Sequence, residues 1–346
     1  MQIATTFSPP TPLTIAILAL DGAVYSSIIG PLDVFCVANA LCESAGKTAF
    51  ATVRILRVGR RPPASFNQVK IHTHGRIAAT DQFDVVIVPA MMTMDQAPED
   101  PVPAFRPPQL LHWLRRQHAG GACLSSVCAG SFLLARTGLL DGRSATTHWN
   151  LADQFQKSHP QVHLQPRKML VDEHDLITAG GVTAYFDLAL HLVRKFGSAE
   201  LAAGCSKFLL IDPGRRSQSP YQTAQFQKTH ADPAILALQE HLERHFSERL
   251  TLAQMGLIAG LEQRTLLRRF RAATGDTPIM YLQRVRIEAA RRQLELSSES
   301  ISRIAWQVGY EDSSSFNRLF KKITGMTPGG YRKRFSLAVM PDSNSR

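Results

Sequence analysis

The sequence predicts an α/β domain built on a mainly parallel sheet, followed by an all-α domain that contains two helix-turn-helix units. Three observations support this prediction. Apolar runs of strand length alternate with helical segments over the first part of the chain, the pattern becomes wholly helical from Asp232 onward, and a segment of about fifty residues recurs in that helical part. Alternation of strands and helices is typical of a parallel sheet covered by helices on both faces.

The elements of the first domain follow from the apolar runs and the turn residues between them. Strands are expected at 13–20, 51–58, 84–89 and 122–127, and helices at 30–41, 109–118, 129–136 and 184–196. A hairpin is expected over 168–178 with a polar tip at 172–175. We therefore assign 1–210 to the first domain, 211–230 to a linker rich in proline and polar residues, 231–336 to the second domain and 337–346 to a flexible tail.

Composition and charge narrow the function classes. The chain has 346 residues, of which 44% are hydrophobic, and a net charge of +11, which fits a globular protein with an anionic partner. Residues 231–336 hold 17 basic and 11 acidic residues, so the excess of positive charge is more concentrated in this part of the chain. The five cysteines include no C-x-x-C pair, so we expect neither a disulfide framework nor a metal site, and no cofactor. The first apolar run is too short to span a bilayer, and a cytoplasmic location without a membrane is expected.

The recurring segment has the frame F-x-x-x-T-G-x-T-P-x-x-Y, beginning at Phe270 and again at Phe320. In each copy a short helix ends near a glycine, a polar cap follows at Glu262 or Asp312, and a second helix covers 263–273 or 313–323. The second helices bury one apolar stripe and leave a basic, polar face exposed. Two copies with this arrangement indicate a reader of double-stranded DNA rather than an ordinary helical bundle.

The second domain resembles the AraC/XylS family of transcription regulators, above all over 304–331, which reads IAWQVGYEDSSSFNRLFKKITGMTPGGY. The resemblance implies binding to DNA and to RNA polymerase. It also implies which side chains meet the DNA: Arg264, Leu267 and Arg268 in the first unit, Ser314, Ser315 and Arg318 in the second, with Lys321 and Lys322 as further contacts. Gly256 stands where the family usually has alanine, which predicts a less stable first helix.

A cysteine in the first domain lies at a predicted turn between a strand and a helix. Cys128 follows the apolar run 122–127 and precedes small residues that begin a helix, an arrangement typical of a nucleophile elbow. The amides at the start of that helix could stabilise a thiolate or bind an anion. His148 follows and is a candidate partner for the sulfur.

Residues 13–196 resemble the DJ-1/PfpI superfamily, with a flavodoxin-like sandwich in which Cys128 is the elbow cysteine. Enzymes of that superfamily have a carboxylate four residues before the position of Pro31, where this chain has Ser27; Asp21 or Asp33 could substitute. We therefore expect no catalysis. The resemblance instead places Ser27, Cys128, Ala129 and His148 around a ligand pocket, with Cys128 and His148 as remnants of a catalytic pair.

The joint architecture resembles GlxA-type transcription regulators. It implies a homodimeric activator whose first domain senses a small metabolite, with amino-acid derivatives and quaternary ammonium compounds as candidate effectors. Two alternatives remain open. One is a cysteine-dependent enzyme similar to isonitrile hydratases or amidases with an appended DNA-binding module, and the other is a redox sensor that uses Cys128. An inert, buried Cys128 ranks between the pocket role and true catalysis.

Overall fold

The computed structural model of the protein describes residues 11–92, 108–224, 226 and 228–337. The chain divides into two compact units, Met1–Gln218 and Ser219–Arg346, and each is described by itself. The division falls inside the stretch that composition marks as linker. Of the tail expected at 337–346, residues 338–346 lie outside the described residues.

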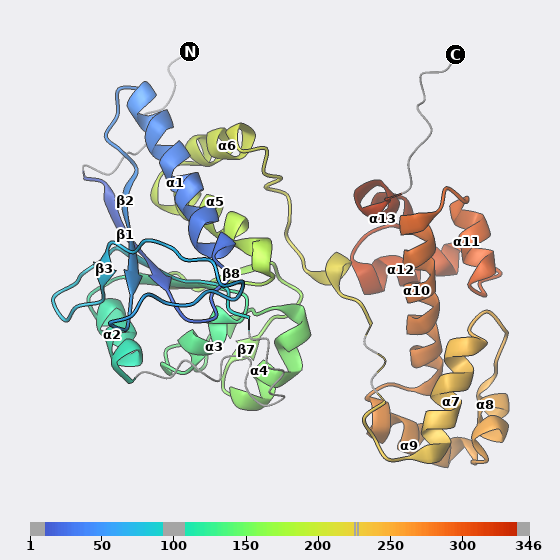
Figure 1. Cartoon of the computed structure of the whole chain (residues 1–346). Helices are drawn as coiled ribbons and strands as arrows, with labels where there is room; N and C mark the ends of the chain where they lie inside the picture. Colours follow the sequence, from blue (N-terminus) through green and yellow to red (C-terminus); the bar gives the residue numbers. More distant parts are fainter. Residues whose placement is uncertain (1–10, 93–107, 225, 227, 338–346) are drawn as a thin grey trace, which may run out of the picture. The chain divides into compact units, whose positions relative to one another are not determined.

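The first unit is built on a seven-stranded sheet with the order β3-β2-β1-β4-β5-β9-β8 (Figure 1). Every pair of neighbours is parallel except β8 and β9, which form the expected hairpin. The strands are β1 (Leu13–Ala19), β2 (Ala51–Arg57), β3 (Gly75–Arg76), β4 (Val85–Val88), β5 (Cys123–Val127), β8 (Leu170–Asp172) and β9 (Leu176–Ala179), with a separate pair β6 (Ser144–Ala145) and β7 (His163–Leu164). The predicted strands are confirmed, and those missed, β3, β6 and β7, are two residues long, too short to form an apolar run.

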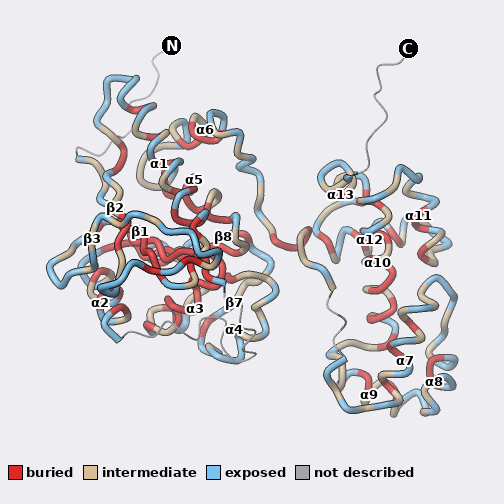
Figure 2. The backbone as a smooth tube through the Cα atoms, in the orientation of Figure 1, coloured by how far each residue is buried: buried red, intermediate tan, exposed pale blue. Residues whose placement is uncertain are grey.

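Helices cover both faces of the sheet, as the alternating pattern predicts (Figure 1). On one face α1 (Ser26–Ser44), α5 (Tyr185–Phe196) and α6 (Ala199–Phe208) pack against one another. On the other face lie α2 (Pro108–Ala119), α3 (Gly130–Ala135) and α4 (Ala152–Ser158). Figure 2 shows the buried residues concentrated along the strands between these layers. By length and composition α1 could cross a membrane, but Ile28, Val34 and Phe35 are fully buried in the core, as in a core helix.

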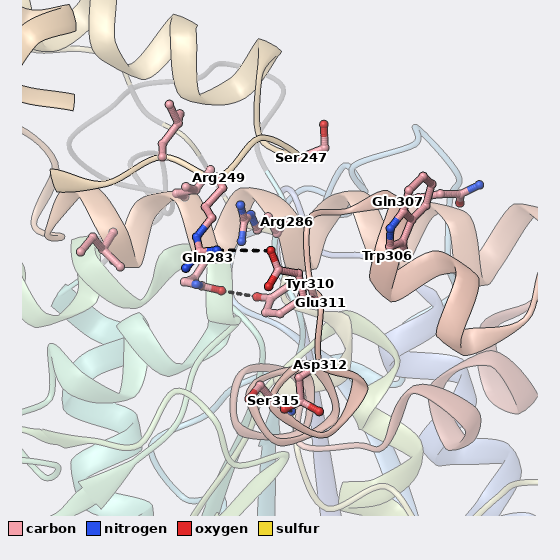
Figure 3. Close-up of a pocket in the computed structure, with 14 residues that line it drawn as sticks. Ser247, Arg249, Gln283, Arg286, Trp306, Gln307, Tyr310, Glu311, Asp312 and Ser315 are labelled. Atoms are coloured by element: carbon pink, nitrogen blue, oxygen red, sulfur yellow. Dashed lines mark hydrogen bonds and ion pairs between the residues drawn. The ribbon is translucent and has the colours of Figure 1, made fainter. Parts of the chain in front are cut away.

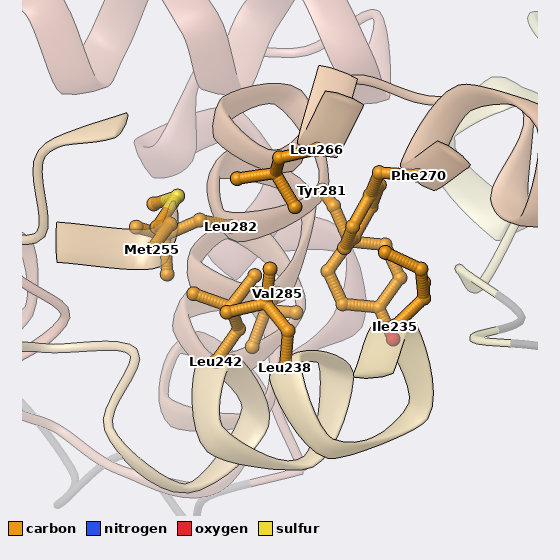
Figure 4. Packing of buried hydrophobic residues seen from close by; sticks show 9 residues of the cluster. All are labelled: Ile235, Leu238, Leu242, Met255, Leu266, Phe270, Tyr281, Leu282 and Val285. Carbon is orange, nitrogen blue, oxygen red and sulfur yellow. The ribbon is translucent and has the colours of Figure 1, made fainter. Parts of the chain in front are cut away.

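In its described part, the second unit has helices and no strands. Its helices are α7 (Pro233–Arg244), α8 (Leu252–Ala259), α9 (Gln263–Thr274), α10 (Pro278–Leu296), α11 (Ile301–Gln307), α12 (Ser313–Thr324) and α13 (Pro328–Phe335). Two hydrophobic cores lie along α10. The first joins α7, α8 and α9 to Tyr281, Leu282 and Val285 (Figure 4), and the second joins α11, α12 and α13 to Ile287, Ala290 and Leu294. The long helix thus holds both helix-turn-helix units.

Each position of the repeated frame has the same structural role in both copies. Phe270 and Phe320 are fully buried, and each ring lies 5.4 Å, edge to face, from the tyrosine that closes its frame, Tyr281 or Tyr331. The frame's first threonine hydrogen-bonds to the end of its own helix, the glycine takes the left-handed conformation, and the second threonine caps the next helix before proline. Each copy of the repeat therefore encodes the end of one helix, a turn and the start of the next helix.

Candidate nucleic-acid interface and elbow site

In the first helix-turn-helix unit, α8 and α9 are the two helices and the turn lies between them. Thr251 and Gln254 form a reciprocal capping box at the start of α8, and Gly260, at φ 61°, ends that helix in the left-handed conformation. A Cβ at Gly256 would lie 2.7 Å from the carbonyl oxygen of Leu261. Gly256 therefore has a steric reason that the sequence did not reveal: it allows the turn to approach α8 closely.

Of the two helix-turn-helix motifs, the second has the better-capped recognition helix, α12. The carboxylate of Asp312 accepts hydrogen bonds from the amides of Ser314 (3.0 Å) and Ser315 (2.8 Å) at the start of α12. Hydrogen bonds from Ser315 and Ser314 lower the pKa of Asp312 to about 2, so it is ionised at neutral pH. Glu262 occupies the same place before α9 but its side chain caps no amide. Both predicted residues occupy the cap positions, but only Asp312 bonds to amides, because glutamate is one methylene longer and does not close the same short ring.

Most side chains expected to contact DNA lie on the outer faces of α9 and α12. The exposed ones are Arg264, Arg268, Ser314, Arg318, Lys321 and Lys322. Leu267 and Ser315 are half-buried, and the hydroxyl of Ser315 accepts a hydrogen bond from Arg318 at 3.2 Å. Arg264 and Arg268 form no ion pair within the described part of the chain. By contrast, Arg269 is held by Asp232 at 2.6 and 2.8 Å on the inner side of α9.

A pocket of about 760 Å³ lies within the second unit, between its two helix-turn-helix motifs, and was not foreseen from the sequence (Figure 3). Arg286 of α10 crosses it and donates to the carbonyl oxygens of Phe246 (2.7 Å) and Glu248 (2.8 Å). Tyr310, in the turn of the second unit, donates to Gln283 of α10. Arg286 is mostly buried, and burial lowers the pKa of its guanidinium. These bonds join the loop before α8 and the turn between α11 and α12 to the same helix, α10, which favours a fixed separation of α9 and α12.

In the α/β unit, Met1–Gln218, the elbow geometry at Cys128 is confirmed. Its backbone has φ 55°, a conformation rare for residues other than glycine, between β5 and α3. Its amide donates to the carbonyl of Ala179 at 2.8 Å. A Cβ at Gly130 would lie 2.5 Å from the carbonyl oxygen of Pro89, so only glycine lets α3 start so close to β4.

The chemistry of the sulfur differs from the expectation of a thiolate. Cys128 is only 3% exposed. Burial raises its pKa to about 12 and outweighs the opposing hydrogen bond from the amide of Ala129. Cys128 is therefore a neutral thiol at physiological pH, because one amide does not compensate for the loss of solvation.

The other pocket candidates have structural roles. Ser27 is fully buried; its hydroxyl donates to the carbonyl of Val24 at 2.6 Å and accepts from the amide of Ala90 at 2.9 Å. It ties α1 to the end of β4. Ala129 is buried beside the start of α3. Of the alternative carboxylates, Asp21 accepts from the amide of Ala64 and is exposed, as is Asp33.

His148 and Cys128 do not form the expected pair. The Nδ1 atom of His148 accepts from the amide of Asn150 at 3.1 Å, and burial lowers the pKa of the imidazole, which favours its neutral form. Within the described residues no hydrogen bond joins His148 to Cys128; the hydroxyl of Thr147 donates instead to the Cys128 carbonyl at 3.2 Å. Thr147 is a contact that the sequence did not single out. The described residues contain no group of three or more His, Cys, Asp or Glu arranged to hold a metal.

Comparison with known proteins agrees with both halves of this description. The DJ-1/PfpI family matches residues 14–195, and a helix-turn-helix domain matches residues 256–334. The HTH-type transcriptional regulator CdhR of Pseudomonas aeruginosa is 28% identical over 290 residues, which cover 83% of this chain and 82% of that protein. The HTH-type transcriptional regulator GlxA of Rhizobium meliloti is 30% identical over 223 residues, 64% of this chain and 68% of that protein.

Among solved structures, Drosophila melanogaster DJ-1beta matches with a TM-score of 0.48 and 22% identity, over 58% of this chain and all (100%) of that chain. The two family matches lie in the order that the sequence predicts, on the α/β unit and on the repeated helical unit. The chain therefore belongs to the DJ-1/PfpI family and is a transcription regulator in which a DJ-1/PfpI domain precedes an AraC-type helix-turn-helix domain.

Proposed function

We propose that this protein is an effector-responsive transcription activator that acts in the cytoplasm as a homodimer. Its second unit binds specific promoter DNA by placing α9 and α12 in successive turns of the major groove. Its first unit binds a small metabolite, an amino-acid derivative or quaternary ammonium compound, near the elbow of Cys128, and RNA polymerase is its partner at the promoter. It catalyses no reaction.

One observation chiefly supports the DNA-binding half of this proposal. The two copies of the repeated frame present second helices whose outer faces carry exposed cations, Arg264 and Arg268 on one and Arg318 and Lys321 on the other. A free guanidinium on an exposed helix face can bind guanine in a bidentate manner or pair with phosphate. The bonds of Arg286 across the pocket favour a fixed separation of the two helices.

Replacing Arg318 should separate base reading from phosphate binding. If Arg318 reads a guanine, Arg318→Ala loses about 1–3 kcal/mol at a single base pair, whereas Lys321→Ala weakens binding equally for all sequences. Sequences selected from a random duplex library and affinities from fluorescence anisotropy measure both effects. Arg303→Ala is the matched control, since Arg303 is exposed on α11 and pairs with Glu299 at 2.9 Å. An equal loss on all sequences for Arg318→Ala would assign it to phosphate.

The role of the elbow is tested with Cys128→Ala. We expect the substitution to change the effector concentration needed for the transcriptional response, because the sulfur lies at the proposed pocket, and to leave DNA binding by the second unit unchanged. Cys205→Ala, at another fully buried cysteine, is the control. A response identical to wild type would make Cys128 a packing residue.

The alternative function, a cysteine-dependent enzyme, is tested by comparing wild type with Cys128→Ala. Ser27 has no ionisation near neutral pH and already holds two backbone groups, so it is a poor general base. Mass spectrometry should recover bound effector intact from wild type. Release of a product by wild type that Cys128→Ala abolishes would establish catalysis and overturn the regulatory assignment of this site.

A further inference from the structure

The last residue of the first unit inserts its side chain into that unit. Gln218 is 1% exposed, although the linker in which it lies is otherwise polar. Around its Nε2 atom are the carbonyl oxygens of Thr147 (2.8 Å), Lys168 (3.0 Å) and Pro166 (3.1 Å), and the hydroxyl of Thr146 (3.2 Å). Its Oε1 atom accepts from the amide of Trp149 at 3.2 Å. One side chain therefore serves five polar groups of the first unit.

The carboxamide fits a slot that depends on Gly180. A Cβ at position 180 would lie 2.3 Å from both Cδ and Nε2 of Gln218, which no real contact allows. The acceptors that face the slot are carbonyl and hydroxyl oxygens, so it suits a neutral group that donates two hydrogens. A carboxylate there would meet oxygen atoms and lose its solvation.

The slot adjoins the elbow of Cys128. Thr147 accepts from Gln218 through its carbonyl and donates from its hydroxyl to the Cys128 carbonyl at 3.2 Å. The amide of the preceding residue, Thr146, donates to Thr178 of β9 at 2.8 Å. Gln218 thus holds residues 146–149, the segment that contains His148, beside the elbow.

The residues that directly follow Gln218 are held by the second unit. Arg291 of α10 is 3% exposed, and its Nη2 atom donates to the carbonyls of Ser219 (3.1 Å) and Pro220 (3.3 Å). Its Nη1 atom donates to the carbonyl of Gln222. The peptide bond between Gln218 and Ser219 therefore joins a residue fixed beside the elbow to a residue fixed on the helix that holds both DNA-reading units.

We propose that Gln218 is a positioning residue that couples the Cys128 site to the DNA-binding unit. Its carboxamide holds the 146–149 segment against the elbow, and a rearrangement of that segment is passed through the chain to the stretch that Arg291 binds. That the coupled signal is an effector rests on the proposed function. The mechanical link itself depends only on the contacts above.

The link is tested on the full-length protein with Gln218→Met, which keeps the length of the side chain and removes its hydrogen bonds. The rate at which iodoacetamide modifies Cys128, followed by peptide mass spectrometry, should rise about tenfold, because unsatisfied buried groups favour local opening. The rates at Cys123 and Cys205, which are also buried, should stay within about twofold of wild type. The hydrogen-exchange rate of the Gln222 amide, which donates to Ser219, should rise as well.

Two further variants complete the test. Gly180→Ala keeps glutamine at position 218 but displaces its carboxamide from the slot, and should reproduce both increases. Ser217→Ala removes the neighbouring linker bond to the Arg167 carbonyl (2.9 Å) and should reproduce neither. An unchanged Cys128 or Gln222 rate in folded Gln218→Met and Gly180→Ala would overturn the proposal, as would an equal rise at Cys123, Cys128 and Cys205. The assay contains neither effector nor DNA, so its failure leaves the proposed function untouched.

Discussion

Phe320→Ala should destabilise the second helix-turn-helix unit by about 3–5 kcal/mol, because it empties the centre of a small core. Phe320 is fully buried, with its ring 5.6 Å from Phe316 and 5.4 Å from Tyr331. Chemical denaturation followed by circular dichroism measures the loss. Asn317→Ala, on the exposed face of the same helix, is the control and should cost little. A stability within about 1 kcal/mol of wild type would contradict the packing described for this core.

The same substitution should change how the protein occupies DNA. Two recognition helices in successive turns of the groove protect segments roughly 10–10.5 bp apart. Loss of the second core should leave protection only where α9 binds, and Phe270→Ala, in the first core, should leave only the segment bound by α12. Footprinting on a selected duplex distinguishes these outcomes. Loss of both segments in each variant would mean that neither unit binds alone.

DNA binding by the isolated second unit, 219–346, should fall steeply with salt. Each cation that pairs with a phosphate releases a counterion, so the logarithm of the association constant declines linearly with the logarithm of the salt concentration. Exposed cations on the two recognition helices are Arg264, Arg268, Arg271, Arg318, Lys321 and Lys322. If all of them pair with phosphate, affinity drops on the order of 10³-fold between about 50 and 200 mM salt. A fragment that is folded yet binds equally at both concentrations would argue against a phosphate-binding surface.

The structure also changes where that fragment should begin. The sequence suggests a domain from residue 231, but Arg291 is buried against the carbonyls of 219, 220 and 222, and Phe226 packs on the first core. A fragment that starts at 231 leaves a buried guanidinium with fewer partners. We therefore expect 219–346 to be the more stable fragment in thermal unfolding.

The sequence by itself determined the features that rest on local patterns. The repeated frame fixed the second unit, since its phenylalanine, glycine, threonine, proline and tyrosine positions each specify a helix ending, a turn or a helix start, and their angles depend on near neighbours. Apolar runs likewise predicted the main strands, and small residues after an apolar run predicted the elbow at Cys128. Short strands such as β6 and β7 gave no such signal.

Only the tertiary structure decided which partners and how much solvent the side chains of the candidate site contact. It left His148 bonded to Asn150 instead of Cys128, raised the pKa of the thiol by burial, and gave Ser27 two backbone partners. It also placed Gln218, an ordinary residue of a polar linker, in a slot opened by Gly180. These outcomes depend on contacts between segments distant in the chain, and on solvent exclusion that appears only when the segments pack. Local sequence sets backbone angles and amphipathic faces, whereas desolvation and hydrogen-bond partners are properties of the assembled core.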